Sequence, residues 1–249
     1  MKSDLPKPLK DFYQKRENSI SSLMNDANLQ EQGIKIMRDS GPFNYAYNFD
    51  WLGVPAIQLP TDMVAIQELI WKLKPQVIIE TGVAHGGSII FYSSLLHLID
   101  EGGIVVGIDI DIRDHNRDVI ESHKLSKNIH LVEGSSTDKE TLEEVEQIAQ
   151  NKSALVILDS DHSKDHVAKE LDAYKKFVNK GGYLIVMDTT LEDQPDDFLK
   201  DRPWNKLNNP KVAVWEFLDK NKNWVSDDNI DGKLLLTVCK NGFLKKISD

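Results

Sequence analysis

The alternation of short apolar segments with helical patterns, from residue 61 onward, constrains the fold more than any other feature. Five segments rich in Val and Ile are strand candidates: 76–81, 104–110, 129–134, 154–159 and 183–188. They are apolar almost throughout, as expected of parallel strands that helices cover on both faces. Helical patterns occupy 61–73, 87–99, 137–149, 163–179 and 211–220. The alternation predicts an α/β, Rossmann-like fold with a mostly parallel twisted sheet.

The two ends of the chain follow other patterns. Residues 5–38 predict one or two amphipathic helices, and an aromatic-rich loop punctuated by prolines continues to residue 60. We therefore expect an N-terminal extension over 1–60, serving as a lid or an oligomer contact, and one sheet domain over 61–249. Near the C-terminus, apolar segments 234–239 and 243–247 flank Lys240-Asn241-Gly242. An Asn-Gly pair in that setting predicts an antiparallel hairpin at the edge of the sheet.

Composition narrows the functional class. The 249 residues carry a formal net charge of −10 without a basic stripe, so nucleic acid is not an expected partner. No apolar segment approaches the roughly 20 residues of a membrane-spanning helix, and the charged start lacks the apolar core of a signal peptide. The single cysteine, Cys239, excludes an internal disulfide and a thiolate metal site. These features predict a cytoplasmic protein.

The candidate site lies at the carboxyl ends of the strands, where open α/β sheets bind ligands. The first strand continues into ETGVAHGGS, residues 80–88. Glycines there allow close backbone approach to a ligand, and the next helix directs its N–H groups toward it. The candidate contacts in this segment are Glu80, Gly82, His85, Gly86 and Ser88.

The next two strand ends extend a nucleoside site. The second strand ends at Asp109, whose carboxylate can accept hydrogen bonds from both ribose hydroxyls, and Ser135 follows the third strand. A Walker loop is excluded because no lysine follows Gly87, and the glycine spacing matches a dinucleotide fingerprint poorly. The pattern fits an S-adenosylmethionine site better. The alternative that Gly86 and Gly87 only begin a helix stays open.

Acidic residues also follow the fourth and fifth strands. Asp159 and Asp188 end neighbouring strands, and two carboxylates facing one cleft repel each other unless a cation or proton lies between them. Oxygen ligands favour magnesium, manganese or calcium. The third ligand is expected from Thr189, Glu192 or Asp193.

His162, three residues after Asp159, suits a general base for a substrate hydroxyl held at that metal. The structural alternative is that Asp159 only holds a loop while Asp161 or Ser163 caps the following helix. His166 is interpreted as a solvated residue or one at the edge of the core.

Five segments together resemble the family named after cephalosporin hydroxylase, which also includes rhamnosyl and macrolide-sugar O-methyltransferases. The segments are IIETGVAHGGS (78–88), VVGIDIDIR (105–113), EGSS (133–136), LDSDHSKDHV (158–167) and DTTLED (188–193). The resemblance covers about residues 43–245 and implies a class I methyltransferase fold, S-adenosylmethionine and a divalent metal. It also implies Asp159 and Asp188 as metal ligands, with Asp159 close to the cofactor, and His162 as the base. The family often has adjacent acids after the fifth strand, whereas here Thr189 follows Asp188.

Together these features predict a metal-assisted, S-adenosylmethionine-dependent O-methyltransferase. The acceptor is expected to be a hydroxyl of a sugar, glycolipid or natural product, and the protein is expected to form a homo-oligomer. The alternatives are a nucleoside-binding subunit without catalysis and, against the glycine spacing, an NAD-dependent sugar-modifying enzyme. An oxygenase is disfavoured because no His-x-Asp or His-x-Glu occurs in the chain.

Overall fold

The computed structural model describes residues 5–198, 200 and 202–249, and this part of the chain contains a seven-stranded sheet of order β5-β4-β3-β6-β7-β9-β8. The parallel strands are β3 (Val77–Thr81), β4 (Ile104–Asp109), β5 (Ile129–Glu133), β6 (Ala154–Leu158) and β7 (Tyr183–Val186). The strand β9 (Phe243–Lys246) is antiparallel to β7 and to the edge strand β8 (Trp224–Ser226). The predicted α/β fold with its five parallel strands is confirmed.

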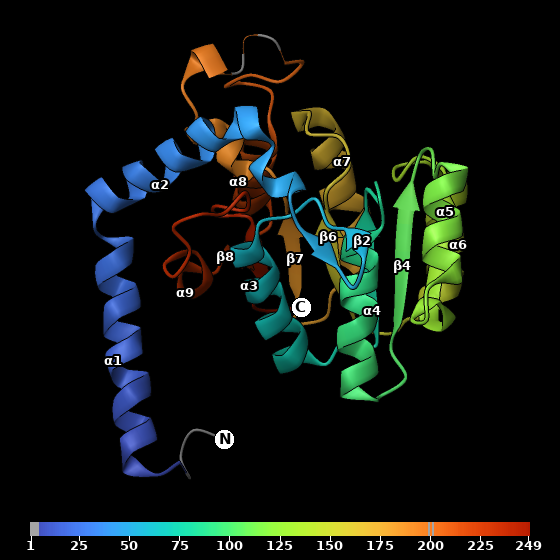
Figure 1. Cartoon of the computed structure of the whole chain (residues 1–249), viewed down its shortest axis with the longest axis horizontal. Helices are drawn as coiled ribbons and strands as arrows, with labels where there is room; N and C mark the ends of the chain where they lie inside the picture. The colour runs from blue at the N-terminus through green and yellow to red at the C-terminus, as the bar shows by residue number, and fades with distance from the viewer. Residues whose placement is uncertain (1–4, 199, 201) are drawn as a thin grey trace.

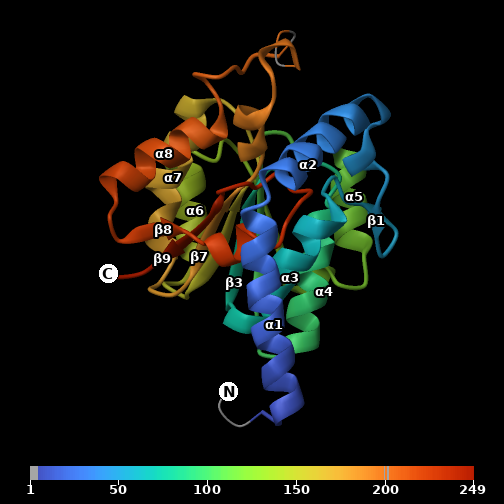
Figure 2. The same cartoon turned by 90° about the vertical axis from the view of Figure 1, so that its left-hand side faces the viewer.

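Helices cover both faces of this sheet, as Figure 2 shows. One face carries α3 (Pro60–Leu73), α4 (Gly87–Ile99) and α5 (Asp114–Ser122), and the other carries α6 (Lys139–Ala149), α7 (Lys164–Tyr174) and α8 (Pro210–Lys220). Short 3-10 helices η3 (Ser126–Asn128) and η4 (Lys175–Phe177) lie in the connections. The sequence did not predict α5, because this polar helix buries only Asn116 and Ile120.

The strands are apolar throughout because each of their faces packs against a helical layer. Ile78 and Leu155 are fully buried on the side of α3, α4 and α5. Ile79 and Val156 are fully buried on the side of α6, α7 and α8. This double burial explains why the strand segments lack the apolar–polar alternation of a half-exposed sheet.

The N-terminal part consists of two helices and a small hairpin. Helix α1 (Lys7–Met24) buries no residue and extends away from the sheet, whereas α2 (Ala27–Ser40) lies near the carboxyl ends of the parallel strands (Figure 1). The 3-10 helices η1 (Gly41–Phe43) and η2 (Tyr45–Tyr47) lead to the hairpin β1 (Asp50–Trp51) and β2 (Val54–Pro55). The predicted helices in 5–38 are confirmed. No helix among the described residues is both long and apolar enough to span a membrane.

The C-terminal antiparallel pair is confirmed, but its first strand differs from the prediction. The turn forms at Asn241, with φ 62°, and Gly242 as expected. Residues 234–239, however, form no strand, and β9 instead pairs with β8 across a connection that contains α9 (Asp228–Asp231). The segment is drawn toward α3, because the N–H of Val238 donates to the buried carboxylate of Asp62 at 2.9 Å.

We expect Gly82→Ala to destabilise the fold more than Gly53→Ala. Both glycines have φ near +90°, where an alanine costs roughly 1–2 kcal/mol. A Cβ at Gly82 would lie 2.0 Å from the carbonyl oxygen of Asp159, whereas a Cβ at Gly53 would meet nothing within 4 Å. Overpacking should add about 1–3 kcal/mol at Gly82 alone. Urea unfolding of both variants measures the difference, and equal losses would show that the close approach is unimportant.

Candidate functional site

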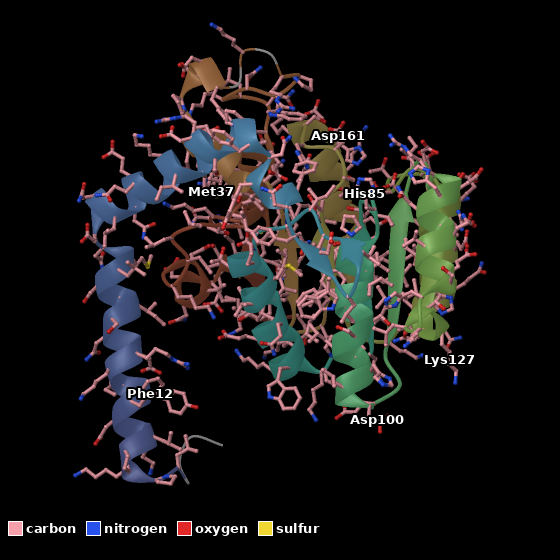
Figure 3. All side chains as sticks on the ribbon, in the orientation of Figure 1. Phe12, Met37, His85, Asp100, Lys127 and Asp161 are labelled. Atoms are coloured by element: carbon pink, nitrogen blue, oxygen red, sulfur yellow. The ribbon has the colours of Figure 1, made fainter. Side chains whose placement is uncertain are left out.

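A cavity of about 870 Å³ opens at the carboxyl ends of the parallel strands. Its walls come from the loops after β3, β4, β5, β6 and β7 and from residues of α2, η1 and η2. Figure 3 shows His85 and Asp161 at this end of the sheet, with Met37 of α2 on the same side, while Asp100 and Lys127 lie at the opposite end. The N-terminal part therefore contributes to the cavity wall.

The loop after β3 is fixed to the end of β4 by the carboxylate of Asp109. Its Oδ2 accepts hydrogen bonds from the N–H groups of Val83, at 2.8 Å, and Ala84, at 3.2 Å. Most of the predicted cofactor contacts line the cavity together: Gly82, His85, Gly86, Ser88, Asp109, Ser135 and Asp159. The rule that ligands meet the carboxyl ends of strands brought these residues together correctly.

Glu80, also predicted as a cofactor contact, lies behind the cavity wall. It is fully buried, and its two carboxylate oxygens accept hydrogen bonds from Ser88 Oγ at 2.6 Å and from the Tyr92 hydroxyl at 2.8 Å. Burial raises the pKa of Glu80 to about 8. Glu80 therefore fixes the first turns of α4, and Ser88 is the member of this group that lines the cavity.

Asp159, His162 and Asp188 form the most tightly grouped set of ionisable side chains in the cavity. One potential ligand atom from each lies within 4.8 Å of the others. Nε2 of His162 is 3.6 Å from Oδ1 of Asp159 and 3.2 Å from Oδ2 of Asp188. Asp188 has φ 55°, a left-handed conformation that is uncommon for a residue other than glycine. Two carboxylates this close form the kind of oxygen-donor set that a hard divalent cation prefers.

The electrostatics of this group depend on whether a cation is bound. Burial and the charge of Asp188 raise the pKa of Asp159 to about 6, against the effect of the His162 hydrogen bond. Burial lowers the pKa of His162, but Asp188 and Asp159 outweigh it and raise that pKa to about 9. An imidazole with this pKa is protonated at neutral pH and cannot accept a proton. A divalent cation between the carboxylates would offset their charge and favour the neutral, basic imidazole.

The structure directs the predicted third ligands away from this group. The 3-10 helix η5 (Thr189–Asp193) turns the chain toward α8. There Glu192 Oε2 accepts a hydrogen bond from Asn209 Nδ2 at 2.5 Å, and Asp193 pairs with the buried Lys211 at 2.6 Å. Thr189 donates to the carbonyl oxygen of Lys240. The metal-binding group that the structure assembles is Asp159, His162 and Asp188, without these side chains, and their role as metal ligands stays a prediction. Sequence order does not show which way a short helical turn points.

His166 was interpreted as solvated or at the edge of the core, yet it lines the cavity. Its Nε2 is 3.1 Å from the hydroxyl oxygens of both Ser136 and Ser160. Both hydroxyls donate to Oε1 of the fully buried Glu170, at 2.6 and 2.7 Å. The four-residue spacing of His166 and Glu170 on α7 is the signal that could have found this group.

Trp204 also lines the cavity, and nothing in the sequence indicated it. The centroids of its ring and of the His162 ring are 5.3 Å apart, with the planes tilted by 52°. It lies after η6 (Asp196–Phe198), in the irregular residues 202–209 that precede α8. Such a segment has no periodicity from which its position could be inferred.

Sequence comparison identifies one family and several relatives. The family model described as Rhamnosyl O-methyltransferase/CmcI matches residues 43–247. The rhamnosyl O-methyltransferase of Mycobacterium bovis (strain BCG / Pasteur 1173P2) is 26% identical over 147 residues, which are 58% of each chain. That of Mycobacterium leprae (strain TN) is 28% identical over 155 residues, 61% of this chain and 66% of the relative. The matched region thus spans less than two thirds of these relatives.

Solved structures support the fold. An apo structure of CmcI matches with a TM-score of 0.57 at 19% identity, and the match covers 82% of this chain and 78% of the CmcI chain. A CmcI structure with Mg and SAM has a TM-score of 0.56 at 19% identity, and the match covers 81% of this chain and 78% of the CmcI chain. MycE methyltransferase from the mycinamycin biosynthetic pathway, with Mg and SAH, has a TM-score of 0.52 at 19% identity. This match covers 85% of this chain and 53% of the MycE chain. The fold is therefore that of class I methyltransferases, as the resemblance implied.

The imidazole of His162 should titrate near pH 9 in the presence of a chelator, because Asp159 and Asp188 stabilise its charged form. The folded-state pKa exceeds the unfolded value of about 6.5, so His162 should stabilise the fold fully below that pH. This contribution should be lost as the pH rises through 9. NMR of labelled imidazole measures the midpoint, and saturating Mg²⁺ should lower it. A midpoint near 6.5 that Mg²⁺ leaves unchanged would contradict this electrostatic account.

Glu192→Ala should destabilise the protein by about 1–3 kcal/mol, since it leaves the buried Asn209 amide without this acceptor. Glu192→Gln keeps an acceptor oxygen and should lose less. Neither substitution should change Mg²⁺ affinity in calorimetry, whereas Asp159→Asn, the positive control, should reduce it. A loss of Mg²⁺ affinity of about tenfold or more in Glu192→Gln would restore Glu192 as a ligand.

Proposed function

Because the chain belongs to the rhamnosyl O-methyltransferase/CmcI family, we propose that it is a divalent-metal-assisted, S-adenosylmethionine-dependent O-methyltransferase. One observation carries this proposal: the Asp159–His162–Asp188 group and the glycine-rich loop held by Asp109 line the same cavity. A cofactor site and a metal site that share one cavity can bring a methyl donor and an acceptor hydroxyl together.

The cofactor end of the cavity offers groups suited to an adenosyl ligand. The Asp109 carboxylate uses Oδ2 for two backbone N–H groups and Oδ1 for the N–H of Asp111 at 3.2 Å. Each carboxylate oxygen has two lone pairs, so Oδ1 can accept one further hydrogen bond, from a ribose hydroxyl. A Cβ at Gly86 would lie 2.4 Å from the Ile120 side chain, so a residue larger than glycine would disturb the wall here. Ser88 and Ser135 add hydroxyl groups.

At the other end, Asp159 and Asp188 would hold the metal, with Mg²⁺ as first choice and Mn²⁺ or Ca²⁺ as alternatives. A divalent cation there would lower the pKa of an acceptor hydroxyl. Nε2 of His162 lies beside both carboxylates, where it can take the proton of that hydroxyl. The cavity walls would hold the methyl donor and the acceptor hydroxyl together, and such positioning can supply a large part of the rate enhancement.

We propose a hydroxyl of a sugar, glycolipid or natural product as the acceptor. The matched relatives are named rhamnosyl O-methyltransferases, which supports a sugar. The cavity is large enough for a cofactor and a small acceptor together. Nucleic acid is not proposed as a partner, since the chain carries a net charge of −10.

Residues 1–60 are proposed to act as a lid or as an oligomer contact. Their second half supports the lid, because Met37, Tyr45 and Tyr47 line the cavity. Helix α1, with exposed Leu9 and Phe12, supports a contact between copies of the chain. The single, buried cysteine supports action in the reducing cytoplasm.

Calorimetry should show binding of S-adenosylhomocysteine but not of NAD⁺, with or without Mg²⁺. Asp109→Ala should weaken S-adenosylhomocysteine binding by roughly 1.5–3 kcal/mol, the value of a hydrogen bond to a charged group. Asp111→Ala, a neighbouring acid outside the cavity lining, is the matched control and should bind normally. Preferential NAD⁺ binding, or an unchanged affinity in Asp109→Ala, would refute the proposed cofactor site.

A further inference from the structure

Trp204 has a buried polar atom for which the structure provides no partner. Its Nε1 is inaccessible to solvent and makes no hydrogen bond within the described part of the chain. An unpaired buried N–H group is unfavourable, and native proteins rarely leave one without a functional reason. Since Trp204 lines the cavity beside His162, a ligand oxygen is the natural acceptor for this N–H.

The segment that carries Trp204 is tied to the elements that carry the reacting groups. Asn209 Nδ2 donates to Glu192 on η5 and to the carbonyl oxygen of Asn205 at 2.9 Å. Asn208 Oδ1 accepts from the N–H of Lys164, the first residue of α7, at 2.8 Å. Helix η5 directly follows Asp188, and α7 begins two residues after His162. These bonds therefore hold the tryptophan in a fixed relation to the metal-binding group.

Other aromatic residues give the cavity the character of a ring-binding site. Tyr45, Tyr47 and Phe198 line it together with Trp204. Aromatic rings stack on flat or ring-shaped ligands, and an indole adds a hydrogen-bond donor at its edge. Asp159 and Asp188 set a second requirement on the ligand, because a metal bound between them would coordinate two vicinal oxygen atoms of the acceptor.

We propose that Trp204 binds the acceptor, which is a ring that carries a vicinal diol. The edge of the indole contacts the ring, its in-plane N–H donates to a ring substituent oxygen, and the diol is thereby placed at Asp159, Asp188 and His162. This inference rests on the proposed methyltransferase function and assigns Trp204 as its acceptor-binding residue. A sugar and a catechol share this chemistry, and the experiment distinguishes them.

The test uses the full-length protein labelled with 5-fluorotryptophan and saturated with S-adenosylhomocysteine and Mg²⁺. The chain has five tryptophans, and Trp204→Phe assigns the ¹⁹F resonance of Trp204 by its disappearance. Methyl α-L-rhamnopyranoside is titrated in one arm and catechol in the other. We expect the Trp204 resonance to shift saturably in one arm, which identifies the ring as a sugar or an aromatic diol. No shift in either arm would overturn the proposal.

Kinetics with the diol that binds separate acceptor binding from a structural role. Trp204→Ala should raise the acceptor KM about tenfold, the upper range for an aromatic contact, with kcat changed less. Trp204→Phe keeps the ring and should recover part of this loss. Trp215→Ala, at an exposed position on α8, should leave KM unchanged. An unchanged KM in Trp204→Ala would also overturn the proposal.

The same samples separate failure of this inference from failure of the proposed function. If calorimetry shows S-adenosylhomocysteine binding while Trp204 does not respond to either diol, only the assignment of Trp204 fails. If the unsubstituted protein does not bind S-adenosylhomocysteine, the methyltransferase function fails, and the assignment of Trp204 fails with it.

Discussion

The site depends on two like-charged groups that the sheet forces together. Strands β6 and β7 are parallel neighbours with Leu158 opposite Val186, so Asp159 and Asp188 emerge at the same edge. Their carboxylates flank one imidazole, and burial, together with the charge of Asp188, raises the pKa of Asp159 to about 6. Two carboxylates this close repel each other unless a cation or a proton lies between them. Here the candidates are the protonated His162 and a divalent cation, and exchange between them links metal binding to the basicity of the histidine.

Backbone packing connects this group to the cofactor end of the cavity. Gly82 passes so close to the carbonyl oxygen of Asp159 that no side chain fits between the loop after β3 and the end of β6. The N–H of Asp159 in turn donates to the carbonyl oxygen of Thr81 at 2.9 Å. The glycine-rich loop after β3 and Asp159, the acid proposed to bind the metal, are therefore parts of one packed edge of the sheet. In-line transfer requires this property, because small misplacements of the reacting atoms reduce the rate strongly.

Local sequence patterns predicted most of the fold and about half of the arrangement of the candidate site. Burial on both faces made the strands recognisable, and the strand-end rule placed Asp109, Asp159 and Asp188 at one edge. Two differences between prediction and structure depend on contacts distant in the sequence. The direction of Glu192 depends on Asn209, and the loss of the strand at 234–239 depends on Asp62, which accepts the Val238 N–H. No local pattern encodes such partners.

The most direct measurement is a crystal structure with S-adenosylhomocysteine and Mn²⁺, in which anomalous scattering locates the metal. The account predicts one strong peak about 2.1 Å from carboxylate oxygens of both Asp159 and Asp188, with the adenosyl ribose at Asp109. A peak at Glu192 and Asp193, or none between the two strand-end aspartates at saturating Mn²⁺, would contradict it.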